Sequence, residues 1–121
     1  MIECKIDIEN NLLLVFITSG MTKEDIANSI ASVGPLVVQL KENFSIITDL
    51  SEYVSESLEQ IAILNKVNLS IKQKVKVGKV VRIIGQSKTN LLNFSKMDKI
   101  FKMREIKYVA SFKDAIKWLN S

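Results

Sequence analysis

Short apolar runs alternate with stretches of helical periodicity along most of the 121 residues. Apolar runs bounded by turn residues are typical of β-strands, and the stretches between them are typical of amphipathic helices. The predicted strands are Met1–Ile8, Leu12–Thr18, Phe44–Leu50, Lys79–Gly85 and Glu105–Ala110. The pattern therefore predicts the element order β-β-α-β-α-β-α-β-α, which is the order of an α/β fold.

The first two strands differ from each other in pattern. Met1–Ile8 alternates apolar and polar residues, as a half-buried edge strand does, whereas Leu12–Thr18 is continuously apolar, as a strand covered on both faces is. Glu9–Asn11 suits a tight turn between them. Each later strand follows a helix, and right-handed crossovers make such strands parallel. We therefore expect a single domain over residues 1–121, with a five-stranded, mainly parallel sheet and an antiparallel N-terminal edge strand.

Capping residues mark the expected helix starts. Thr22, followed by acidic residues, opens a helix that extends to about Glu42. Pro35 lies inside this helix, and because proline lacks an N–H donor we expect a kink or a break near Val33–Pro35. Three further helices have the candidate caps Ser55 or Ser57, Thr89 or Asn90, and Ser111.

The residue types that are missing limit the chemistry. The chain contains no histidine and one cysteine, Cys4. A Ser-His-Asp or Cys-His catalytic unit is therefore excluded, and a tetrahedral zinc site or any other metal site is not expected. A lone cysteine fits a reducing compartment, and neither a signal peptide nor a bilayer-spanning run is present, so we expect a cytoplasmic protein. No motif for a cofactor is found.

Charge is distributed unevenly. Residues 1–60 carry three basic and ten acidic side chains, whereas residues 61–121 carry fourteen basic and three acidic ones. One interpretation is that both halves have ordinary solvated helix faces. The other is a positively charged face that meets an acidic partner, nucleic acid or anionic lipid. The lysines are spread singly and do not alternate with aromatic residues, which argues against nucleic acid.

A serine occurs at or near the start of each loop that follows an expected parallel strand. Because the carboxyl ends of parallel strands meet at one end of a sheet, these hydroxyls could hold a small ligand or anion there. They could equally cap helices. The candidate ligand-binding residues are Ser19, Gln86, Ser87 and Ser111, and no Gly-rich phosphate-binding motif accompanies them.

The loop after Phe44–Leu50 is the strongest candidate for a working surface. Asp49 ends the strand, and it is expected to brace the loop as a hydrogen-bond acceptor or, alternatively, to act as a catalyst. Tyr53 follows among polar residues, where it is either an exposed contact or an anchor that packs the loop down.

The order of these elements resembles the SpoIIAA-like proteins, which are relatives of the STAS domain of anti-sigma-factor antagonists. The features that carry the resemblance are Leu12–Thr18 followed by Met21–Asp25, Pro35 midway in the first helix, Phe44–Leu50 with its terminal Asp-Leu, Lys79–Gly85, and Ser111–Leu119. The resemblance implies a small, cytoplasmic, non-enzymatic α/β module that binds another protein or a small ligand.

The resemblance also implies a candidate switch. In the antagonists, a partner kinase phosphorylates a serine in an Asp-Ser-Ser-Gly stretch. The aligned stretch here is Asp49-Leu50-Ser51-Glu52, without the Ser-Ser-Gly part, so Ser51, Ser55 or Ser57 could substitute by position. The partner-binding or switch candidates are Asp49, Ser51, Tyr53, Ser55 and Ser57. We thus expect a protein-interaction module, with a small-molecule or lipid carrier as the alternative and a homodimer as a further option.

Overall fold

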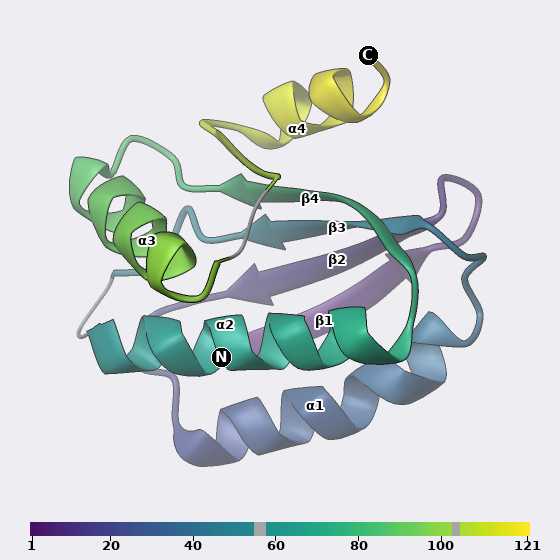
Figure 1. Cartoon of the computed structure of the whole chain (residues 1–121), viewed down its shortest axis with the longest axis horizontal. Helices are drawn as coiled ribbons and strands as arrows, with labels where there is room; N and C mark the ends of the chain where they lie inside the picture. The colour runs from purple at the N-terminus through teal and green to yellow at the C-terminus, as the bar shows by residue number, and fades with distance from the viewer. Residues whose placement is uncertain (55–57, 103–104) are drawn as a thin grey trace.

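A computed structural model describes residues 1–54, 58–102 and 105–121, with only the backbone of residues 67, 70, 73 and 74. It contains one five-stranded sheet whose spatial order, β1-β2-β3-β4-β5, is the order of the sequence (Figure 1). The strands are β1 (Ile2–Asp7), β2 (Leu12–Ile17), β3 (Phe44–Asp49), β4 (Val77–Ile83) and β5 (Ile106–Val109). β1 is antiparallel to β2 and the other neighbours are parallel, which confirms the predicted fold class.

The first two strands form the predicted hairpin, with Asp7 opposite Leu12 in the register. The Asp7 carboxylate accepts hydrogen bonds from the backbone and side-chain amides of Asn10 at 3.0 and 2.8 Å. These bonds lower the pKa of Asp7 below its ordinary value. Asn11 completes the turn at a φ of 54°, a conformation that asparagine tolerates better than most residues.

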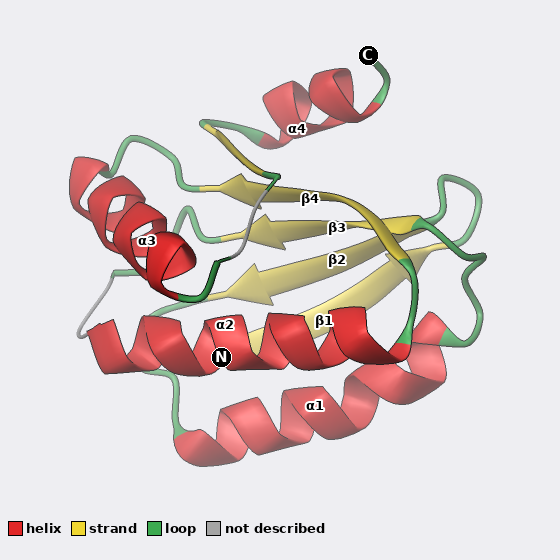
Figure 2. Ribbon diagram, in the orientation of Figure 1, coloured by secondary structure: helices red, strands yellow, loops and turns green. Residues whose placement is uncertain are grey.

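Four helices cover the sheet unequally. They are α1 (Lys23–Val37), α2 (Leu58–Lys74), α3 (Lys88–Ile100) and α4 (Phe112–Leu119). Because the parallel strands follow one another in a single direction, right-handed connections put α1, α2 and α3 on the same face. Helix α4 lies on the opposite face, which Figure 2 shows with helices in red and strands in yellow.

Helix α1 continues through Pro35, so the predicted break is wrong. The proline lies close to the C-terminal end, where it removes a single hydrogen bond, and the helix ends at Val37 rather than near Glu42. The N–H of Val38 then bonds the carbonyl of Gly34 at 3.3 Å. A proline this near the C-terminal end thus does not interrupt the helix.

The helix caps agree with the sequence in two places and differ in one. Thr22 caps α1 in a capping box with Asp25, and Ser111 caps α4. Helix α3 is capped by Ser87, whose Oγ accepts from the N–H of Asn90 at 3.1 Å, so the predicted caps Thr89 and Asn90 are wrong. The physical reason is that the Asn90 side chain is buried and donates to the carbonyl of Tyr53 instead. The predicted caps of α2, Ser55 and Ser57, lie outside the described residues.

Strand β4 begins at Val77, two residues before its predicted start. Gly78 passes so close to the preceding loop that a Cβ there would lie 2.4 Å from the carbonyl oxygen of Asn43. Only glycine fits this approach without movement of the backbone. The N–H of Asn43 also bonds the carbonyl of Lys76 at 2.9 Å, which sets the two strand starts side by side.

Alternating residues of each strand enter two separate cores. In the central strand β3, Ile46 packs with residues of α1 and Ile47 packs with Ala115 of α4. Both isoleucines are almost completely buried, at 2% and 1% exposure, as expected for the middle of the sheet. In the described part of the chain, no helix is both long and apolar enough to pass through a bilayer.

Candidate functional site

The carboxyl ends of β2, β3, β4 and β5 meet at one end of the sheet, and the loops that carry the predicted serines begin there. In many open α/β sheets the strand order reverses at one point, and the reversal opens a crevice that binds ligands. The order here never reverses. This end of the sheet is therefore a rim of adjoining loops, and we call residues 49–54 the rim loop.

Asp49 braces the rim loop from within. Its Oδ1 accepts from the backbone N–H of Ser51 at 2.9 Å and from the Ser51 hydroxyl at 2.6 Å. Of the two roles considered from the sequence, loop bracing matches these bonds. Ser51 itself is exposed, and both residues line a shallow hollow of about 240 Å³ together with Phe16 and Glu52.

Ser19 fastens the rim loop to the neighbouring strand end. Its hydroxyl donates to the carbonyl of Glu52 at 3.4 Å and accepts from the N–H of Val54 at 2.8 Å. The structure thus brings together two of the predicted site regions, the loop after β2 and the loop after β3. The same bonds engage the Ser19 hydroxyl in the fold, so it is not a free ligand for an anion.

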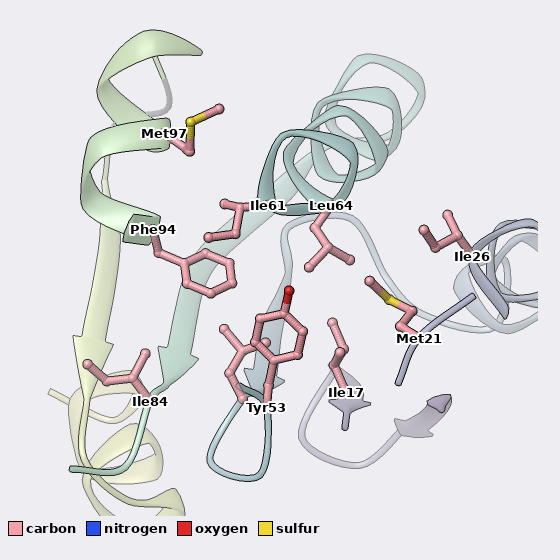
Figure 3. Close-up of a cluster of buried hydrophobic side chains, with 10 residues drawn as sticks. Ile17, Met21, Ile26, Tyr53, Ile61, Leu64, Ile84, Phe94 and Met97 are labelled. Atoms are coloured by element: carbon pink, nitrogen blue, oxygen red, sulfur yellow. The ribbon is translucent and has the colours of Figure 1, made fainter. Parts of the chain in front are cut away.

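Tyr53 is the anchor of the rim loop rather than an exposed contact. Only 2% of it is exposed, and its ring meets the ring of Phe94 edge to face, with 6.0 Å between centroids. Its hydroxyl donates to Oε1 of Gln60 at 2.8 Å, and its carbonyl accepts from Asn90. Figure 3 shows the ring among the apolar side chains of the core. A partner therefore cannot touch Tyr53 without unfolding the loop.

Val54, the next residue, has the opposite environment. It is 67% exposed although its N–H is held by Ser19. Leu58, at the start of α2, is 38% exposed, and the acidic residues Glu52 and Glu59 are exposed as well. The rim therefore exposes the apolar side chain of Val54 to solvent, on a backbone that Ser19 holds. Exposed carboxylates lie on the same segment of the chain. Ser55 and Ser57, two of the predicted switch residues, lie outside the described residues.

Two of the remaining candidates, Ser87 and Ser111, cap helices. Ser87 and Ser111 are N-caps whose Oγ atoms accept from the backbone N–H groups of Asn90 and Asp114. Gln86 is exposed beside Ser87. Capping occupies backbone N–H groups at the two helix N-termini that could otherwise bind an anion, and it supports the second of the two interpretations of these serines.

A buried polar cluster was missed by the sequence prediction. Arg82 of β4, 1% exposed, donates to Oδ1 of Asp98 in α3 at 2.9 Å and to Oδ1 of Asn65 in α2 at 2.8 Å. Asn65 also donates to Oδ1 of Asp98 at 3.1 Å, and Tyr108 of β5 donates to Oδ2 of Asp98. The guanidinium lies over the ring of Phe94 at 5.2 Å. We call Asn65, Arg82, Asp98 and Tyr108 the polar cluster.

The polar cluster is internally complete. Among the described side chains, no buried nitrogen or oxygen atom lacks a hydrogen-bond partner. Burial raises the pKa of Tyr108 well above its ordinary value, so the phenol stays protonated. Because Asn65, Arg82 and Asp98 are buried and Tyr108 donates to Asp98, the cluster joins α2, α3, β4 and β5. Its sequence signals are Arg82, which interrupts the apolar residues Val80–Ile84, and the polar Asn65 within an apolar arc.

Within the described ranges, no group of three or more Cys, Asp or Glu side chains has the arrangement of a metal site. No model of a known protein family matches the chain, and no curated protein is significantly similar to it in sequence.

Proposed function

We propose that this chain is a non-catalytic regulatory module of the SpoIIAA/STAS-like kind that binds another protein through the rim loop and the start of α2. The observation that carries the proposal is the 67% exposure of Val54 in a loop whose preceding residues, Ser51 and Tyr53, are held by hydrogen bonds. Three hydrogen bonds hold the loop: Asp49 and Ser19 accept from the N–H groups of Ser51 and Val54, and Asn90 donates to the carbonyl of Tyr53. A loop that is already ordered avoids much of the entropic cost of binding.

The absence of an obvious catalytic arrangement supports a binding role. The sequence has no histidine, and the only carboxylate at the end of β3, Asp49, is engaged with Ser51. The strand order forms no crevice at the rim. Binding of a macromolecule to an exposed loop requires neither a catalytic arrangement nor such a crevice.

Charge indicates the chemistry of the partner. Glu52 and Glu59 are exposed on the same segment as Val54, so a complementary surface carries basic residues around an apolar pocket. Of the three serines considered as a switch, Ser51 is the one that lies within the described residues. Its hydroxyl lies 2.6 Å from the Asp49 carboxylate, and a phosphate on it would repel that carboxylate and release the brace.

The carrier alternative has less support from the geometry. One cavity, between α1, α2, α3 and the sheet, has a volume of about 40 Å³ and a mainly apolar lining that includes Ile26, Leu64 and Phe94. That volume holds only a few water molecules and no lipid chain. The hydroxyl groups at the rim are used in loop bonds and caps.

The test compares two substitutions of exposed valines at opposite ends of the sheet. Val54→Asp adds a carboxylate to the rim loop, and Val38→Asp adds one after α1, where the side chain is 81% exposed. We expect a tagged wild-type chain to retain specific proteins from a cell extract, quantified by mass spectrometry. Val54→Asp should lose them, and Val38→Asp should keep them. Equal recovery by Val54→Asp and wild type, or no specific recovery at all, would contradict the proposal.

The switch has its own test. Ser51→Asp is expected to weaken recovery of the same proteins, and Ser51→Ala is expected to weaken it less, since alanine adds no negative charge beside Asp49 although it removes the hydroxyl bond. Circular dichroism spectra of all variants establish that the fold is retained.

A further inference from the structure

Helix α3 has an outer face that the fold does not explain. Its inner face is buried and includes Asn90, Phe94 and Met97. At 100° per residue, the position opposite that inner face is Leu92. Lys88, Lys96 and Lys99 lie four residues before, four after and seven after Leu92, so they surround it on the outer surface.

The apolar side chains on this face are well exposed. Leu92 is 70% exposed, and Ile100, at the flank of the same face, is 61% exposed. The three lysines are also exposed, and none of them has an ion pair among the described residues. The only acid of the helix, Asp98, is buried in the polar cluster. The outer face of α3, the helix at the left of Figure 1, therefore combines positive charge with exposed hydrocarbon.

Lys88 makes the pattern unusual. It occupies the first residue of α3, where the helix dipole disfavours a cation. The first turns of α1, α2 and α4 all contain an acid, whereas the first turn of α3 contains none. Local helix stability therefore does not account for this lysine, and an interaction outside the chain would.

We propose that the outer face of α3 binds the surface of a membrane that contains anionic phospholipids. Leu92 and Ile100 enter the boundary between head groups and acyl chains, and the lysines extend to the phosphate and carboxylate groups around them. Each lysine close to an anionic bilayer contributes a favourable electrostatic interaction, which salt weakens.

A lipid surface fits these residues better than other anionic partners. Lysine is a flexible point charge, and it suits head groups that have no fixed positions, whereas rigid acidic or phosphate groups favour the bidentate geometry of arginine. The described outer face has no aromatic residue on which a nucleic-acid base could stack. This proposal is independent of the rim loop, which lies on a separate segment and is acidic.

The experiment measures cosedimentation of the full chain with vesicles. One set is phosphatidylcholine alone, and the other contains phosphatidylserine as well. We expect binding to the second set only, with a loss as salt is raised. Lys88→Glu combined with Lys96→Glu should reduce binding at least about tenfold, and Leu92→Ser should reduce it about tenfold without changing the salt dependence.

A matched control has the same change in charge elsewhere. Lys113 and Lys117 are exposed on α4, and Lys113→Glu with Lys117→Glu should leave most of the binding intact. Val54→Asp should also bind vesicles like the wild type. The proposal is overturned if the wild type does not bind phosphatidylserine vesicles, or if the α4 control loses as much binding as the α3 variant. It is also overturned if polyglutamate or DNA binds the lysine face while vesicles do not.

Discussion

The two faces of the sheet are built in different ways. The face under α4 is wholly apolar in its buried part, with Leu12, Ile47, Val81, Ile83 and Ala115 in contact. The face under α1, α2 and α3 has two apolar clusters and, among them, the polar cluster around Arg82. One face thus uses a single helix and hydrophobic contact, and the other uses three helices and a charged pair.

The difference shows what each kind of contact can specify. Apolar contact depends on area and has little directional preference, so it suffices to hold one amphipathic helix on a sheet. Several helices on one face could slide against each other, and hydrogen bonds with defined geometry oppose such movement. In the polar cluster, Asp98 of α3, Asn65 of α2 and Arg82 of β4 meet, so the positions of both helices are tied to one strand.

The largest effect on stability is expected on the face that contains the polar cluster. Asp98→Ala leaves the Arg82 guanidinium buried at 1% exposure without its charge partner, and we expect the free energy of unfolding to fall by about 3–5 kcal/mol. Urea denaturation measures the change. The double variant Arg82→Met, Asp98→Leu removes both charges and should cost less than Asp98→Ala. If the single variant is the more stable of the two, the cluster is not a coupled charge pair.

The apolar face should respond more mildly to a conservative change. Ile47→Val removes one methylene group from a side chain that is 1% exposed, and we expect a loss of about 0.5–1.5 kcal/mol. The same denaturation assay applies. A loss as large as that of Asp98→Ala would mean that the two faces do not differ in the way described.

The N-caps of α3 and α4, which lie on opposite faces of the sheet, allow a further comparison with smaller expected losses of stability. Ser87→Ala on α3 and Ser111→Ala on α4 each remove an Oγ that accepts a backbone N–H, and each should cost about 1 kcal/mol. Thr89→Ala is the control, because Thr89 is exposed and is not the cap. It should change stability by less than about 0.5 kcal/mol. If Thr89→Ala lost more stability than Ser87→Ala, the cap expected from the sequence, Thr89, would be the correct one.

The smallest effect appears only at alkaline pH. Burial raises the pKa of Tyr108 above its ordinary value of 10.0, so the unfolded chain releases this proton first as the pH rises. The folded state keeps the proton, and its stability therefore falls above pH 10.0. Tyr108→Phe has no phenol to titrate, so its free energy of unfolding relative to that of the wild type should increase with pH in that range. If the free energies of unfolding of the two proteins changed with pH in parallel, the fold would not raise the pKa of Tyr108.

The sequence predicted the architecture because its signals are local. Each strand, each turn and most caps involve residues that lie within a few positions of one another, and the buried Ile46 and Ile47 follow from their place in the middle of the short strand pattern Phe44–Leu50. The polar cluster could not be predicted in this way. Arg82 lies 16 residues from Asp98 and 17 from Asn65, and no periodic pattern connects those positions.

The rim shows the same limit. Asp49 and Ser51 are two residues apart, and a bracing role was among the expectations. The position of Tyr53 depends on Phe94 and Asn90, which belong to a helix that begins 35 residues later in the chain (Tyr53 to Lys88), so exposed and buried alternatives looked equal from sequence.

The sequential strand order has a consequence for synthesis on the ribosome. Every strand pairs with the strand made just before it, so the growing polypeptide can extend one sheet edge by one unit at a time without waiting for a distant segment. The exception is the covering of Ile47 and Val81, which needs α4. Until α4 emerges from the exit tunnel, that apolar surface of the nascent chain is exposed to solvent. A chaperone could bind the surface during this interval.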